Sequence, residues 1–151
     1  MLESKFMKEF FIISNIHRTM SNLLKEKLLQ NNLPLTETQI MILFLMNNKD
    51  KNIITSQDIL EMGHFSTSNL LFSMNSLNNN NYVHVQHNKK KLGYDMHSPV
   101  DLSNNGLEML QKIDKICSNL SYKSQENIVN LLSEYQTSIE EAISKSKKYI
   151  I

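Results

Sequence analysis

The chain has 151 residues, enough for one domain with a buried core, and 40% of them are apolar. With 3 glycines and 2 prolines, long helices are favoured over a turn-rich β fold. The net charge of +1 does not by itself require a nucleic acid or a membrane as partner, and the single cysteine excludes an internal disulfide framework. The apolar run at residues 10–13 is far too short to span a bilayer. We therefore expect a globular cytoplasmic protein.

Helix starts follow the same pattern at several points of the chain. An apolar residue precedes a Ser or Thr cap, and a second apolar residue follows five positions after the first, so that the two can pack together while the cap hydroxyl accepts from free N–H groups. The expected caps are Thr36, Thr55, Ser66 and Ser103. Gln39 and Asp58 add a capping box to the first two.

The first half of the chain is expected to be helical. The expected helices are residues 5–30, ended by Asn31, Asn32 and Pro34, then 37–46, 56–62 with a stop at Gly63, and 67–80. In the last of these, Leu70, Met74 and Leu77 recur at helical spacing and mark a buried face.

A strand pair and two long helices are expected to follow. The alternation in YVHVQH predicts a strand over residues 82–87, a polar tip over 88–93 and a return strand within 96–102. The last two helices carry apolar stripes, the first with Leu107, Leu110, Ile113, Cys117 and Leu120, the second with Ile128, Leu132, Tyr135, Ile139 and Ile143. The terminal helices hold more apolar surface than one small domain needs, which points to a second copy of the chain.

The order helix, short helix, helix and two-stranded β wing describes a winged helix-turn-helix. At this point the chain resembles the MarR-type winged helix-turn-helix transcription regulators, over about residues 35–110. The segments that carry the resemblance are LTETQIMILFLM, ITSQDILEMGHFSTSNLLFSMNSL, NYVHV and DLSNNGLEML.

The resemblance implies a mainly α fold with a two-stranded β wing. Residues 35–103 would form a DNA-binding lobe, and residues 1–34 and 104–151 a helical dimerisation region, together one intertwined domain. It also implies a homodimer, double-stranded DNA as partner, and a small aromatic or phenolic effector of the kind that many members bind between the dimer helices and the lobe.

The wing departs from the family's pattern. Members usually have an Asp-Arg-Arg-like motif there, whereas this chain reads KKKLGYDMHSP and has no arginine in that region. Asn81 stands where members often have glycine, and asparagine tolerates the left-handed conformation that the position needs.

The fourth expected helix would supply the residues that read DNA. Its candidate base-reading residues are Thr67, Ser68, Asn69, Phe72, Ser73 and Ser76. Asparagine can pair with adenine, serine and threonine can bond several base edges, and an aromatic side chain can touch the thymine methyl group. An ordinary polar helix surface is the alternative interpretation of these residues, and the resemblance favours base readout.

The wing would supply the remaining contacts. Its candidates are His87 on the strand and Lys89, Lys90 and Lys91 at the tip, where lysines could approach phosphates or the minor groove. Lysine lacks the two-pronged geometry of arginine, so we expect these residues to position the protein and read few bases. A loop kept soluble by lysines is the alternative.

Other functional classes have little support in the sequence. The 5 histidines and Cys117 show no metal-ligand spacing, and no cofactor is expected. Cys117 lies on an apolar stripe, which favours a core position over a redox sensor. Because no phosphate loop, nucleophile elbow or carboxylate pair is visible, we do not expect an enzyme. The competing hypothesis is a helical protein–protein interaction module that kept the winged-helix fold and lost DNA binding, as the missing arginines and near-neutral charge would allow.

Overall fold

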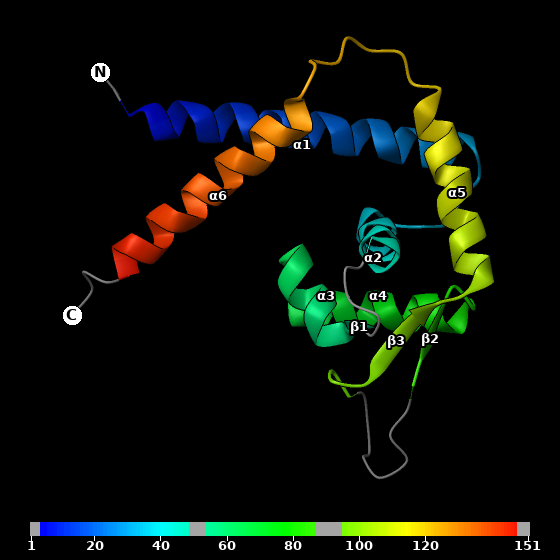
Figure 1. Cartoon of the computed structure of the whole chain (residues 1–151). Coiled ribbons are helices and arrows are strands. Elements are labelled where there is room, and N and C mark those ends of the chain that lie inside the picture. The colour runs from blue at the N-terminus through cyan, green and yellow to red at the C-terminus, as the bar shows by residue number, and fades with distance from the viewer. Residues whose placement is uncertain (1–3, 49–53, 87–94, 148–151) are drawn as a thin grey trace. The chain divides into compact units, whose positions relative to one another are not determined.

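The computed structural model describes residues 4–48, 54–86 and 95–147 and divides the chain into two units, residues 1–119 and 120–151 (Figure 1). The first unit contains α1 (Lys5–Gln30), α2 (Glu37–Asn47), β1 (Ile54–Thr55), α3 (Ser56–Gly63), α4 (Thr67–Asn79), β2 (Val83–Val85), β3 (Pro99–Leu102) and α5 (Asn104–Ser118). The second unit contains α6 (Ile128–Lys147).

The expected helix caps are confirmed. Each cap side chain accepts a hydrogen bond from the backbone N–H three residues on: Thr36 from Gln39, Thr55 from Asp58, Ser66 from Asn69, and Ser103 from Gly106. The side chains of Gln39 and Asp58 accept in turn from the cap N–H groups, each at 3.0 Å, so both capping boxes form. These local bonds explain why the helices begin where the sequence predicts.

The turns between helices use left-handed residues. Asn81 has a φ of 62°, which confirms that asparagine makes the turn after α4. At the end of α3 the left-handed residue is His64, with a φ of 53°, and Gly63 is the last helical residue. A Cβ atom on Gly63 would clash with the Phe65 ring, so a larger residue there would force that ring to move.

The sheet has three strands in the order β1-β3-β2. Strands β2 and β3 confirm the expected two-stranded wing, and β1 is a third strand that the sequence did not predict. The wing strands β2 and β3 pair antiparallel with Val83 opposite Leu102, and β1 pairs with the other edge of β3 through Ile54 opposite Val100. With only 2 residues, β1 is too short to show the alternation by which a strand is recognised in a sequence. The expected tip over residues 88–93 lies outside the described residues.

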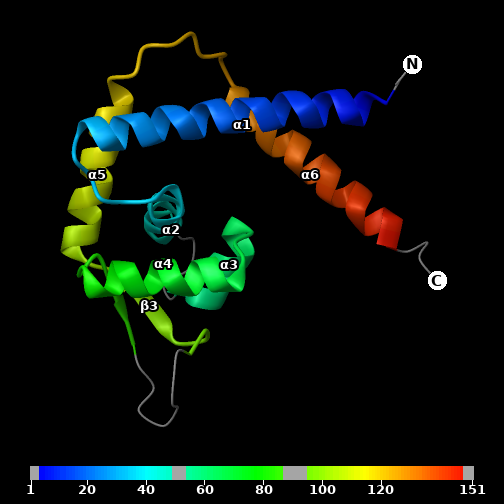
Figure 2. The ribbon, with the colours of Figure 1, turned by 180° about the vertical axis from the view of Figure 1, so that it is seen from behind.

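The core of the first unit surrounds α2, which contacts α1, α3, α4, α5 and β3 and lies between α1 and α4 in both views (Figures 1 and 2). The buried apolar residues are Leu28, Leu33, Leu35, Ile40, Ile42, Leu43, Met46, Ile54, Ile59, Leu70, Met74, Leu77, Val83, Val100, Leu110 and Ile113. The lobe and helices α1 and α5 therefore share one core.

Large apolar side chains remain exposed on the terminal helices of the single chain. In α1 they are Phe6, Met7, Phe10, Phe11, Ile12, Ile13, Ile16, Met20, Leu23 and Leu29, each at least 37% exposed. Among the described residues of α6 none is buried, and Leu132 and Ile143 of its apolar stripe are half exposed. On the expected stripe of α5, Leu110 and Ile113 are buried, but Leu120 lies beyond the helix end at Ser118.

Candidate nucleic-acid interface

Helix α4 has one fully buried face and one exposed face. Leu70, Met74 and Leu77 have no exposed surface, as expected. At about 100° per residue, the residues on the opposite side are Ser68, Phe72, Asn75 and Asn79, and all of them are exposed. The buried leucines and methionine thus fix which side of α4 faces outward.

Ser73 does not belong to the exposed face, and the expectation that it would lie there was wrong. Its side chain is only 2% exposed. Position 73 comes three residues after Leu70 and four before Leu77, so that helical geometry places it on the buried side, beside both of them. A serine at this place is small enough to stay within the packed face.

The other expected residues of α4 have accessible positions. Thr67, Ser68, Asn69 and Phe72 are exposed, and Ser76 is half-buried. Asn75 and Asn79 were missed by the sequence reasoning. They follow Phe72 by three and seven residues, which is the spacing of residues on one helix face. Helical periodicity could therefore have predicted that they lie on the same face as Phe72.

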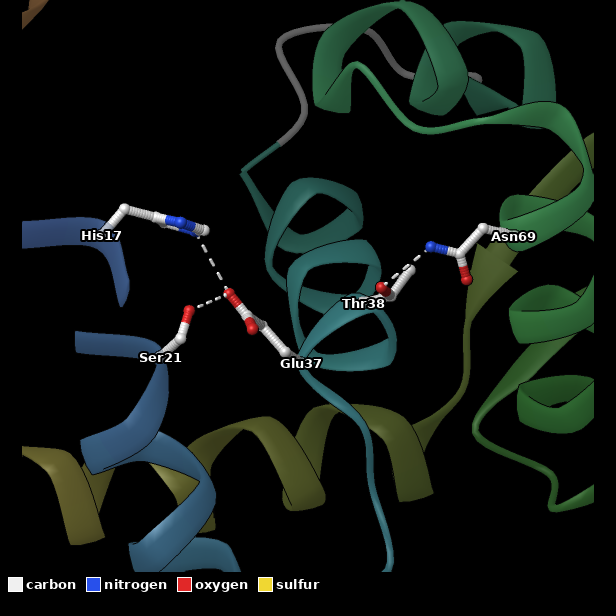
Figure 3. Close-up of polar contacts among 5 residues, drawn as sticks. All are labelled: His17, Ser21, Glu37, Thr38 and Asn69. Carbon is white, nitrogen blue, oxygen red and sulfur yellow. Dashed lines mark hydrogen bonds and ion pairs between the residues drawn. The ribbon is translucent and has the colours of Figure 1, made fainter. Parts of the chain in front are cut away.

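The first turn of α4 is fastened to α2 by a polar contact (Figure 3). Asn69 Nδ2 donates to Thr38 Oγ1 at 3.2 Å. Thr38 lies in the first turn of α2, 31 residues away in the sequence, so the bond cannot be predicted from a local sequence pattern. The amide of Asn69 is thereby engaged with the protein itself, and the contact helps to fix the rotation of α4.

The first turn of α2 is also tied to α1 (Figure 3). Glu37 Oε1 accepts a hydrogen bond from Ser21 Oγ at 2.7 Å and lies 3.4 Å from His17 Nε2. Because Glu37 and Thr38 are consecutive residues, one helical turn connects the long N-terminal helix to the start of α4.

The turn that joins α4 to the wing is held by the start of α5. Ser103 Oγ donates to the carbonyl oxygen of Asn81 at 2.6 Å, and Ser103 N donates to that of Tyr82 at 3.1 Å. Gly106 permits this approach, because a Cβ atom there would lie 2.1 Å from the Tyr82 carbonyl oxygen. The start of α5 therefore holds the base of the wing through hydrogen bonds to the backbone carbonyl groups of Asn81 and Tyr82.

Solved structures of other proteins share this arrangement. The chain is similar to AbfR of Staphylococcus epidermidis, with 18% identity and a TM-score of 0.71 over 91% of this chain and 92% of that chain. It is also similar to MepR in the S. aureus MepR–DNA complex, with 16% identity and a TM-score of 0.63 over 90% of this chain and 99% of that chain. A mutant of MarR from E. coli has 15% identity and a TM-score of 0.62 over 92% of this chain and 98% of that chain. The chain has the winged helix-turn-helix fold of MarR-type regulators. No family model and no curated protein sequence matches it.

In this MarR-type fold, α3 and α4 are the helix-turn-helix and β2 and β3 are the strands of the wing. The described residues 62–86, which include α4 and β2, contain no Asp, Glu, Lys or Arg, so α4 presents an uncharged polar face. The four expected wing residues, His87, Lys89, Lys90 and Lys91, lie outside the described residues.

Cys117 lies half-buried on α5. Burial, and to a lesser extent the negative charge of Asp114, raises the pKa of the Cys117 thiol above its ordinary value. The thiol therefore stays protonated at neutral pH.

Within residues 4–48, 54–86 and 95–147, no cluster of three His, Cys, Asp or Glu side chains could hold a metal ion. No helix in these ranges is both long and apolar enough to cross a membrane.

Proposed function

We propose that the chain is a homodimeric, cytoplasmic transcription regulator that binds a pseudo-palindromic site in double-stranded DNA. Each α4 would enter a major groove, with the two grooves about one helical turn apart. The observation that carries the proposal is the exposed, uncharged polar face of α4, opposite the buried Leu70, Met74 and Leu77. A MarR-type protein of the same fold, MepR, has been solved bound to DNA.

The second copy of the chain is proposed to cover the apolar surface of the terminal helices. A large exposed apolar patch marks an interaction surface, and the first half of α1 exposes Phe6, Phe10, Phe11 and Ile12 in the single chain. Residues 1–34 and 104–151 would form this dimer contact. A small aromatic or phenolic effector, bound between the dimer helices and the lobe, would shift the spacing of the two lobes.

Selection of bound sequences from a pool of genomic fragments, with the purified full chain, tests the proposal. We expect enrichment of a sequence with two related half-sites, and tighter binding of it than of a scrambled duplex in fluorescence anisotropy at moderate salt. Few cations are available per lobe, so the affinity should fall only modestly with salt. Equal affinity for the selected and scrambled duplexes would contradict sequence-specific regulation.

A protein–protein interaction module is the second candidate function. It is favoured by the near-neutral net charge of +1 and by the arginine-free wing. Replacement of Lys89, Lys90 and Lys91 by glutamate separates the candidates, because the loss of positive charge weakens binding to duplex DNA in a DNA-binding protein. An interaction module would show no duplex affinity to lose.

A further inference from the structure

One apolar side chain stands in the middle of the polar face of α4. Phe72 is 73% exposed and lies on the side of the helix opposite Leu70 and Met74. Ser68, one turn before it, and Asn75, one turn after it, are both exposed and uncharged. The surface that α4 offers is therefore a single aromatic ring flanked by short polar side chains.

Two features fix the orientation of this surface: the buried face of α4 and a hydrogen bond between α4 and α2. The buried residues on the far side of α4 leave Phe72 no route into the core by rotation of the helix. The bond from Asn69 Nδ2 to Thr38 Oγ1, at 3.2 Å, holds the first turn of α4 against α2 (Figure 3). Because its amide is engaged there, Asn69 is better suited to position α4 than to pair with a base.

We infer that Phe72 is a specificity-determining residue that contacts the C5-methyl group of a thymine in the major groove. The inference rests on the proposed function and names the base feature that α4 reads. In the major groove, thymine differs from the other bases by this methyl group, and an apolar side chain such as phenylalanine recognises it by contact. The ring has no hydrogen-bond donor or strong acceptor with which to read another base edge.

The polar residues beside the ring complete the reading. Ser68 and Asn75 can donate and accept hydrogen bonds at the edges of the adjacent base pairs. Ring contact excludes water from the methyl group, so it adds discrimination without any charge on the helix. This division of roles explains how an uncharged helix selects a sequence.

Substitution of single thymines by uracil tests the inference, because it removes the methyl group and keeps base pairing. The probe is the duplex selected by the full chain, with deoxyuridine at one position at a time. Loss of one buried methyl group should weaken binding about fourfold at one half-site, and about fifteenfold when both half-sites are changed. We expect this loss at one position in each half-site.

The variants Phe72→Ala and Asn75→Ala assign the effect to a side chain. Phe72→Ala should bind the thymine duplex more weakly and bind the thymine and uracil duplexes equally. Asn75→Ala, the matched control one turn away, should lose affinity on both duplexes and keep the difference between them. Both residues are exposed, so thermal unfolding of the variants should match that of the unchanged chain.

Two results would overturn the inference and leave the proposed function standing: a selected duplex whose affinity is unchanged by uracil at every position, or a Phe72→Ala variant that still prefers thymine. A selection that enriches no sequence would overturn the proposed function and the inference with it.

Discussion

Removal of the Ser103 hydroxyl is expected to destabilise the chain more than removal of any exposed helix cap. The hydroxyl accepts from Gly106 N at 3.0 Å and donates to the Asn81 carbonyl at 2.6 Å, so that it serves both α5 and the turn before the wing. Loss of an N-cap costs about 1 kcal/mol. The second bond, which is exposed, adds about 0.5 to 1 kcal/mol. Ser103→Ala should therefore lower the free energy of unfolding by about 1.5 to 2 kcal/mol.

Ser66→Ala is the matched comparison. Ser66 caps α4 through a single exposed bond to Asn69 N at 3.2 Å, and its removal should cost about 0.5 to 1 kcal/mol. Urea unfolding followed by circular dichroism, at one fixed protein concentration, measures both variants, since the stability of an oligomer depends on concentration. Ser103→Thr should keep most of the stability, because it retains the hydroxyl.

The comparison of the two caps decides whether the reasoning holds. If Ser103→Ala costs no more than Ser66→Ala, the bond to the Asn81 carbonyl contributes nothing, and the base of the wing is held by other contacts.

Three further outcomes are expected. Gly106→Ala should lower the urea midpoint, because a Cβ atom 2.1 Å from the Tyr82 carbonyl oxygen forces overpacking of about 1–3 kcal/mol, which exceeds the gain in helix propensity; an unchanged midpoint would show that the backbone adjusts freely. Cys117 should react with iodoacetamide at pH 8 more slowly than a free thiol, because its raised pKa leaves less thiolate, and Asp114→Asn should speed the reaction. Equal rates for the free thiol, the unchanged chain and the Asp114→Asn variant would contradict this account. Ser73→Ala should leave the affinity for the selected duplex unchanged in anisotropy, because the side chain is buried, and a weaker affinity would place it at the DNA.

Much of the site could be predicted from the sequence because its determinants are local. The cap of α4 at Ser66 and the buried positions Leu70 and Met74 depend on residues within one or two turns of each other, and all three are confirmed. The assignment of Ser73 to the exposed face failed through an incomplete use of the same periodicity, which places it beside Leu70. The wing residues from Lys89 to Lys91 remain a prediction.

Only the tertiary structure decided the contacts between distant segments. The bond from Asn69 to Thr38 spans 31 residues, and the pairing of Ile54 with Val100 makes a strand of a segment too short to show any pattern. By itself, the sequence determined where helices begin and which faces are apolar, because capping bonds and helical periodicity act within a few residues. The position of α4 against α2 required the packed core, because the bond from Asn69 to Thr38 exists only when the chain has folded.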